Sequence, residues 1–212
     1  MSATIIPQPV RKDLMIMRKA IIIFCLVCLA SLVTISLLFG HIPNWVFFNL
    51  GFTLLIIPAC SCGIFLAMKT IVMEKEKSTQ SFIMSLPVTV KEFTQAKLLV
   101  NLPVFSLLWL LVTSVAFYFC FGLGVFPYGT VPFITMIFVG IFVAYTGILC
   151  ASLLFQSMAV TILTVMTSEL GTAAYLWIVA YLEPIKSHVY GPEMVWNSTA
   201  ISIVGTQVLV AV

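Results

Sequence analysis

Glu169 is the acidic residue whose position in this sequence is hardest to explain without chemistry. It lies near the middle of the apolar run 158–182, where an ionisable group is expensive and marks a functional site by default. Its side chain could be protonated, could pair across an interface between two chains, or could face a substrate path. Alternatively, the helix breaks at Gly171 and the acid lies in protein-buried or wet backbone. The apolar runs hold no Lys, Arg or His to pair with it, which argues against a proton-coupled carrier with a relay of charges.

The histidines and cysteines offer little further chemistry. His41 and His188 stand alone at loop edges, whereas a membrane hydrolase or transferase needs clustered polar residues at catalytic spacing. The six cysteines all lie in apolar runs, and no pair has a companion pair or a histidine at the spacing of a zinc site. Buried cysteine usually behaves as a small hydrophobe. We therefore expect no enzyme activity, no metal and no cofactor in this chain.

The composition indicates lipid as the solvent. Hydrophobic residues make up 62% of the 212 residues, charged residues only 8%, and the mean hydropathy is +1.19, whereas a soluble domain carries roughly 25% charge. Helices satisfy every backbone group within lipid, and a span needs about 20 apolar residues. The net charge of +3 is too small to indicate nucleic-acid binding. We predict an all-α, polytopic membrane protein, one transmembrane domain over residues 1–212, with spans near 20–40, 45–68, 98–121, 132–155, 158–182 and 198–212.

The sixth predicted span is incomplete. Its roughly 15 residues would rise about 22 Å at 1.5 Å per residue, which is short of a full crossing. Either this helix ends early or the natural chain continues beyond Val212.

Basic residues predict the orientation of the spans. Nine of the ten Lys and Arg residues lie either before the first run or between the second and third runs, and only Lys186 lies elsewhere. Lys and Arg accumulate in cytoplasmic loops, so we expect the N-terminus and the segment 69–97 to be cytoplasmic. The nine are Arg11, Lys12, Arg18, Lys19, Lys69, Lys75, Lys77, Lys91 and Lys97.

The residues before the first run have two readings. The basic pair at 11–12 recurs at 18–19, and apolar residues fall on the opposite side of a helix, as in a helix lying along the membrane surface. The same pattern fits a bent extension of the first span with basic anchors.

The segment between the second and third runs carries two local signals. Residues 78–86 place serines on one side of a short amphipathic helix and apolar residues on another, and Pro87 cannot continue that helix. Thr89 followed by Glu92 then forms a capping box, with Val88 and Phe93 as a hydrophobic staple, and the new helix runs into the third span. The segment is either a well-capped connection or a rigid device that transmits motion.

This segment resembles the permeases of type-2 ABC exporters, in particular their small bacterial six-span branch. In that family a charged stretch with a downstream threonine leads to a Ser-Leu-Pro-Val motif, then to a basic residue with glutamate, and then to a small residue and lysine before the third span. Residues 12–14 before the first span are also similar to that branch. The matching residues here are Glu74 to Thr79, Ser85 to Thr89, Lys91, Glu92, Ala96 and Lys97.

The resemblance implies a coupling element that docks on a separate ATPase. The chain has no phosphate-binding loop of the form G-x-x-x-x-G-K-[ST], so a partner dimer of ATPase subunits would bind ATP and Mg²⁺. The family further implies a second permease chain, identical or related, surrounding lipid, no nucleic acid, and a bacterial cytoplasmic membrane. The residues expected to contact the ATPase are Glu74, Glu76, Thr79, Leu86, Pro87, Thr89, Lys91 and Glu92.

We therefore expect the transmembrane subunit of an ATP-driven exporter of an amphipathic substrate, which could be a peptide, a lipid-like molecule or a drug. The family favours a peptide, and Glu169 is the candidate for the substrate path. The alternatives are an ion-coupled secondary transporter and a membrane protein with no transport role.

Overall fold

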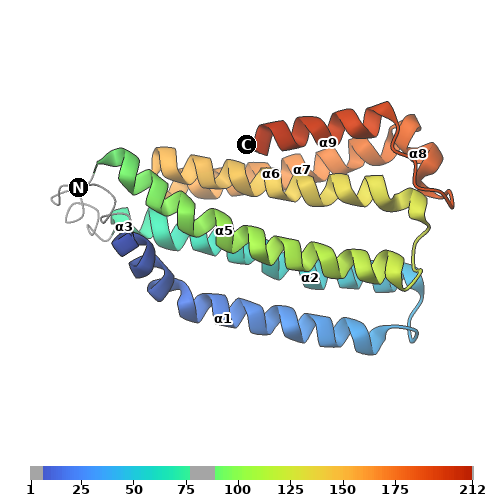
Figure 1. The fold of residues 1–212 in the computed structure, drawn as a ribbon, viewed down its shortest axis with the longest axis horizontal. Helices are drawn as coiled ribbons and strands as arrows, with labels where there is room; N and C mark the ends of the chain where they lie inside the picture. The colour runs from blue at the N-terminus through green and yellow to red at the C-terminus, as the bar shows by residue number, and fades with distance from the viewer. Residues whose placement is uncertain (1–6, 77–88, 212) are drawn as a thin grey trace.

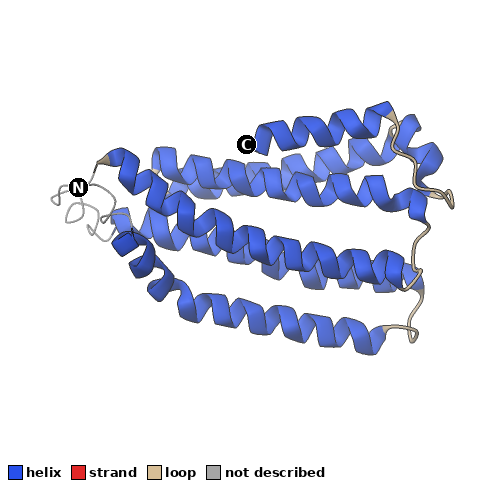
Figure 2. Ribbon diagram, in the orientation of Figure 1, coloured by secondary structure: helices blue, strands red, loops and turns tan. Residues whose placement is uncertain are grey.

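The chain folds into a bundle of long helices. The computed structural model describes residues 7–76 and 89–211, and every regular element in these ranges is a helix (Figures 1 and 2). The elements are α1 (Pro7–Leu38), α2 (Asn44–Ala67), the π-helical turn η2 (Met68–Val72), α3 (Met73–Glu76), α5 (Val90–Phe117), the π-helical turn η3 (Tyr118–Gly122), the 3₁₀ turn η4 (Tyr128–Thr130), α6 (Val131–Phe155), α7 (Met158–Tyr181), α8 (Glu183–Val189) and α9 (Ser198–Ala211).

Five of these helices are long and apolar enough to cross a membrane, which agrees with the predicted all-α, polytopic membrane protein. Helices are the expected solution because each backbone donor and acceptor finds its partner within the same segment. The first five predicted spans overlap these helices, although the first begins ten residues and the third eight residues earlier than expected. The candidate spans, by length and composition, are Val10–Leu38, Asn49–Val72, Val90–Gly122, Tyr128–Phe155 and Met158–Tyr181.

The sixth span stays a prediction. Helix α9 has 14 residues, which corresponds to about 21 Å at 1.5 Å per residue and is shorter than the hydrocarbon core. In Figure 1 it ends part-way along α6, against which it packs.

In the part of the chain that the structure describes, the residues before the first span belong to the same helix as the span. Residues 7–38 form one uninterrupted helix, and Figure 1 shows its first turns inclined to the rest. The continuity of these residues with the first span fits the second reading of the sequence, a bent extension, whereas an interfacial position of the first turns stays a prediction. Helix α7 is likewise continuous through Gly171, so the expected alternative of a break at this glycine is wrong.

The helices pack as two groups. Helices α1, α2 and α5 contact one another, as do α6 and α7 and α6 and α9, and α6 also packs against α2 and α5. Buried Met17, Leu66 and Val100 join α1, α2 and α5. The stacked rings of Phe105 and Tyr145, whose centroids lie 3.6 Å apart, join α5 to α6.

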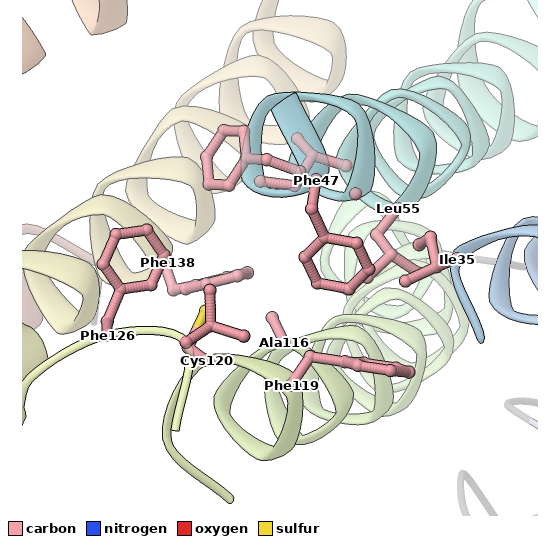
Figure 3. A pocket seen from close by; sticks show the side chains of 12 residues that line it. Ile35, Phe47, Leu55, Ala116, Phe119, Cys120, Phe126 and Phe138 are labelled. Carbon is pink, nitrogen blue, oxygen red and sulfur yellow. The ribbon is translucent and has the colours of Figure 1, made fainter. Parts of the chain in front are cut away.

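The two ends of the bundle differ in chemistry. The end that holds the first turns of α1, the turn η2 and the start of α5 carries most of the Lys and Arg side chains and is called the basic end below. At the opposite end, a small pocket of about 30 Å³ is enclosed by apolar side chains (Figure 3). Phe47, Phe138 and Cys120 line it, and a space of this size holds no more than about one water molecule.

Candidate functional site

The ammonium group of Lys97 lies inside the basic end of the bundle. It donates hydrogen bonds to Asp13 Oδ2 and to Glu74 Oε2, both at 2.7 Å. The side chains of Lys97 and Asp13 are 2% and 1% exposed, so both charges are removed from solvent. The ring of Phe93 covers the ammonium group, with the nitrogen 5.3 Å from the ring centroid.

A second lysine completes this ion-pair cluster. Lys12 Nζ donates to Glu74 Oε1 at 2.6 Å, so the two oxygens of Glu74 bind two different lysines. We call Lys12, Asp13, Glu74 and Lys97 the charge cluster. It holds two positive and two negative groups, and its members come from α1, α3 and α5.

The balance of charge explains why the cluster tolerates burial. Removing an ion from water costs several kcal/mol unless a partner and hydrogen bonds compensate. Each carboxylate here accepts at least one short hydrogen bond from a lysine, and Lys97 donates to two. Loss of one member would leave an uncompensated charge among packed helices, so the cluster fixes the relative positions of α1, α3 and α5.

A neutral polar network continues from the cluster along α5. Asn101, one turn after Lys97, donates through Nδ2 to Thr70 Oγ1 at 3.0 Å and to Lys97 O at 2.9 Å. Tyr145 of α6 donates through its hydroxyl to Asn101 O at 3.1 Å. The start of α5 is therefore bonded to α1, α3, η2 and α6.

The first turn of α5 is closed by the predicted capping box. Thr89 Oγ1 accepts from the Glu92 amide at 3.3 Å, and Glu92 Oε2 accepts from the Thr89 amide at 2.9 Å. This reciprocal pair satisfies two of the helix-start donors that have no partner inside the helix. The helix that begins here runs without a break to Phe117, as expected.

The charge cluster and the capping box together define the site. Residues 77–88 lie outside the described ranges, but the residues on either side of them are fixed: Glu74 before the segment and Lys97 after it share one ion pair. Glu74 and Lys97 therefore tie α1, α3 and α5 together on the two sides of residues 77–88.

The residues predicted to contact an ATPase fall into three groups. Thr89 and Lys91 are exposed at the start of α5, and Glu92 is held by the cap. Glu74 is buried in the charge cluster, with an internal partner on each oxygen. Thr79, Leu86 and Pro87, together with the amphipathic helix and the staple residue Val88, lie outside the described residues, as does the side chain of Glu76.

Glu169 occupies a different site. It is the twelfth of the 24 residues of α7, so it lies about 17 Å from each end of that helix. Its side chain is exposed and lines a cavity of about 330 Å³ between α2, α5, α6 and α7. No Lys, Arg or His among the described residues forms an ion pair with it.

Sequence reasoning missed the charge cluster. The sequence indicated Lys97 as an orientation signal and a motif residue, Glu74 as a surface contact, and Asp13 only as part of the similar segment 12–14. A topological signal was available: spans two and three form a hairpin, so Glu74 at the end of one and Lys97 at the start of the other must lie near each other. Asp13, an isolated acid at the start of the first span, lies at the same end of the bundle and can pair with Lys97.

Comparisons of this chain with known protein families, curated proteins and solved structures found no match.

Proposed function

We propose that this chain is the transmembrane permease subunit of an ATP-driven exporter of the type-2 ABC class. The observation that carries the proposal is the construction of the basic end. The segment that resembles the coupling element of that class, residues 74–97, is held at two points, by Glu74 and Lys97 of the charge cluster and by the capping box of α5. Both points are continuous with helices that cross the bundle, so movement of the segment would be passed to those helices.

The proposal assigns an orientation and partners. The basic end faces the cytoplasm of a bacterial cell, in agreement with the distribution of Lys and Arg. A dimer of separate ATPase subunits binds ATP and Mg²⁺ there, and a second permease chain, identical or related, completes the pathway. The substrate is amphipathic, and a peptide is favoured.

The two sets of predicted contact residues then have separate roles. Exposed Thr89 and Lys91 lie where an ATPase could touch them, together with the capped Glu92. Buried Glu74 acts through Lys12 and Lys97 on the permease itself, so it positions the coupling segment and is not a contact.

The experiment is purification of the tagged chain in mild detergent from the cells that make it naturally. We expect a subunit with a G-x-x-x-x-G-K-[ST] loop to co-purify and to hydrolyse Mg-ATP. Charge reversals Lys91→Glu and Glu92→Lys should weaken its capture, whereas Tyr190→Ala, at the opposite end, should not. Purification without any ATPase, and transport that survives both reversals, would exclude the proposal.

The charge cluster is also the observation that favours the second candidate, an ion-coupled carrier, because buried acids and bases can relay protons. A relay across the bundle would need further acids or bases beyond the basic end, where the cluster lies. In α7, however, the only Asp, Glu, Lys, Arg or His is Glu169. The energy source separates the two candidates. Transport by the exporter stops when ATP is depleted and persists when an uncoupler collapses the proton gradient with ATP maintained; a carrier shows the reverse.

A further inference from the structure

A partly open, mainly apolar cavity between four helices lies beside Glu169. The cavity of about 330 Å³ falls within the range of about 300–1,000 Å³ that small-molecule sites occupy. Ile56 and Ile64 of α2, Phe105 of α5 and Ile148 of α6 supply apolar walls. The 30 Å³ pocket at the opposite end is too small for any such ligand.

Most of the polar groups lie on one wall. Ser168, Glu169 and Thr172 come from α7, whereas Cys60 lines the same cavity from α2 and Tyr145 lines it from α6. Glu169 is the one acidic side chain in this lining, since every other lining side chain is apolar, aromatic, hydroxyl or thiol. The cavity therefore presents a single carboxyl group within mainly apolar surroundings.

None of the described residues supplies a cation for this carboxylate. Apart from Lys186, every Lys and Arg lies in 11–19 or 69–97. Those described are at the basic end, and Lys186 is in α8, beyond the other end of α7. A second copy packed against α7 would carry no Lys or Arg at the depth of Glu169 either. The described residues therefore leave this carboxylate without a cationic partner.

We propose that this cavity binds an amphipathic molecule that carries a single positive charge, with the Glu169 carboxylate as its counter-ion. A carboxylate at this depth is costly, and a bound cation offsets that cost. The apolar body of the ligand would lie against α2 and α6. That the ligand is the exported substrate rests on the permease function proposed above, whereas its binding does not.

The test is equilibrium binding of tetraphenylphosphonium to the full chain in lipid nanodiscs, with no ATPase and no nucleotide present. Empty nanodiscs correct for partition into lipid. We expect saturable binding that Glu169→Gln weakens about tenfold or more, because the variant removes the charge and keeps the shape. Ala173→Leu, which fills the cavity from α7, should weaken binding as well.

Two controls separate the effect of the ligand's charge from the effect of its hydrophobicity. Glu183→Gln removes an exposed acid outside the cavity and should leave binding unchanged. Tetraphenylborate has the same shape and the opposite charge and should not bind. Equal binding of both ions, or unchanged binding by Glu169→Gln, would overturn the proposal. It would also be overturned if Glu169→Gln altered only the oligomeric state, since the cavity would then be an interface between copies.

Because no ATPase takes part, failure here leaves the permease proposal intact, and failure to capture an ATPase leaves this site intact.

Discussion

Lys97 Nζ lies 2.7 Å from Asp13 Oδ2, although 84 residues separate the two in the sequence. The contact joins the first turns of α1 to the start of α5, and Glu74 adds the end of the second span. A buried lysine between two carboxylates has few stable alternatives, because each rearrangement would leave a charge without a partner. The basic end is therefore the most tightly specified polar region that the structure describes.

Replacing this lysine should destabilise the fold far more than replacing an exposed lysine of the same helix. We expect Lys97→Met to lower the free energy of unfolding by about 3–5 kcal/mol, because Asp13 and part of Glu74 lose their partner. Lys91→Met, six residues earlier and exposed, should change it by less than about 1 kcal/mol. Denaturant unfolding in detergent micelles measures both values.

A double variant tests whether the loss comes from the ion pair itself. Asp13→Asn combined with Lys97→Met should cost less than the sum of the two single changes, since the double variant leaves no unpaired Asp13 carboxylate. Additive losses would mean that Asp13 and Lys97 do not interact as the structure places them.

The capping box should set the stability of the start of α5. Thr89→Ala removes the hydroxyl that accepts from the Glu92 amide and should cost about 1 kcal/mol. Thr89→Ser keeps the acceptor and should restore most of that loss. Hydrogen exchange of the amides at 90–93 gives the readout, with Thr94→Ala as a matched control within the helix. Unchanged protection in Thr89→Ala would show that the cap contributes nothing.

Close packing of α2 against α5 and α6 depends on a glycine. A Cβ at Gly63 would lie 2.7 Å from the Phe105 ring and 2.9 Å from the Tyr145 ring, and these two rings are buried and stacked. We expect Gly63→Ala to destabilise the protein by about 1–3 kcal/mol in a thermal or denaturant melt.

Gly147 on α6 is the matched control for this substitution. A Cβ there would meet no atom within 4 Å, so Gly147→Ala should be neutral or stabilising, since alanine favours the helix. Equal stabilities of Gly63→Ala and Gly147→Ala in these melts would contradict the close packing of α2 against α5 and α6.

Loss of the cluster should separate ATPase binding from permease movement. Lys97→Gln leaves exposed Lys91 and the cap intact, so we expect it to retain the ATPase. A spin label at position 190, at the opposite end, should change mobility when Mg-ATP is added to the normal complex and respond less in the variant. This measurement uses a background without the six native cysteines. Full response in a folded Lys97→Gln variant would show that the cluster does not transmit the movement.

The sequence allowed the spans to be located because apolar runs and polar breaks are local properties. The capping box was also predictable, since Thr89 and Glu92 need only helical geometry to meet. The charge cluster was missed because its members come from three separate elements, and charge counting treats each lysine alone. The continuity of α7 through Gly171 was open for a similar reason: a glycine weakens a helix, but packing of α7 against α6 decides whether it breaks.

Site-specific photo-crosslinking from position 91 tests the central claim most directly. A benzophenone amino acid in place of exposed Lys91 in living cells should form an adduct with a subunit that carries an ATP-binding loop. The same probe in place of Tyr190, which is 86% exposed at the opposite end, should form none. An adduct with an ATPase from position 91 alone is the result we predict. Efficient photolysis at position 91 that yields no ATPase adduct, in cells where the chain remains active, would contradict the assignment of this protein as an ATP-driven permease.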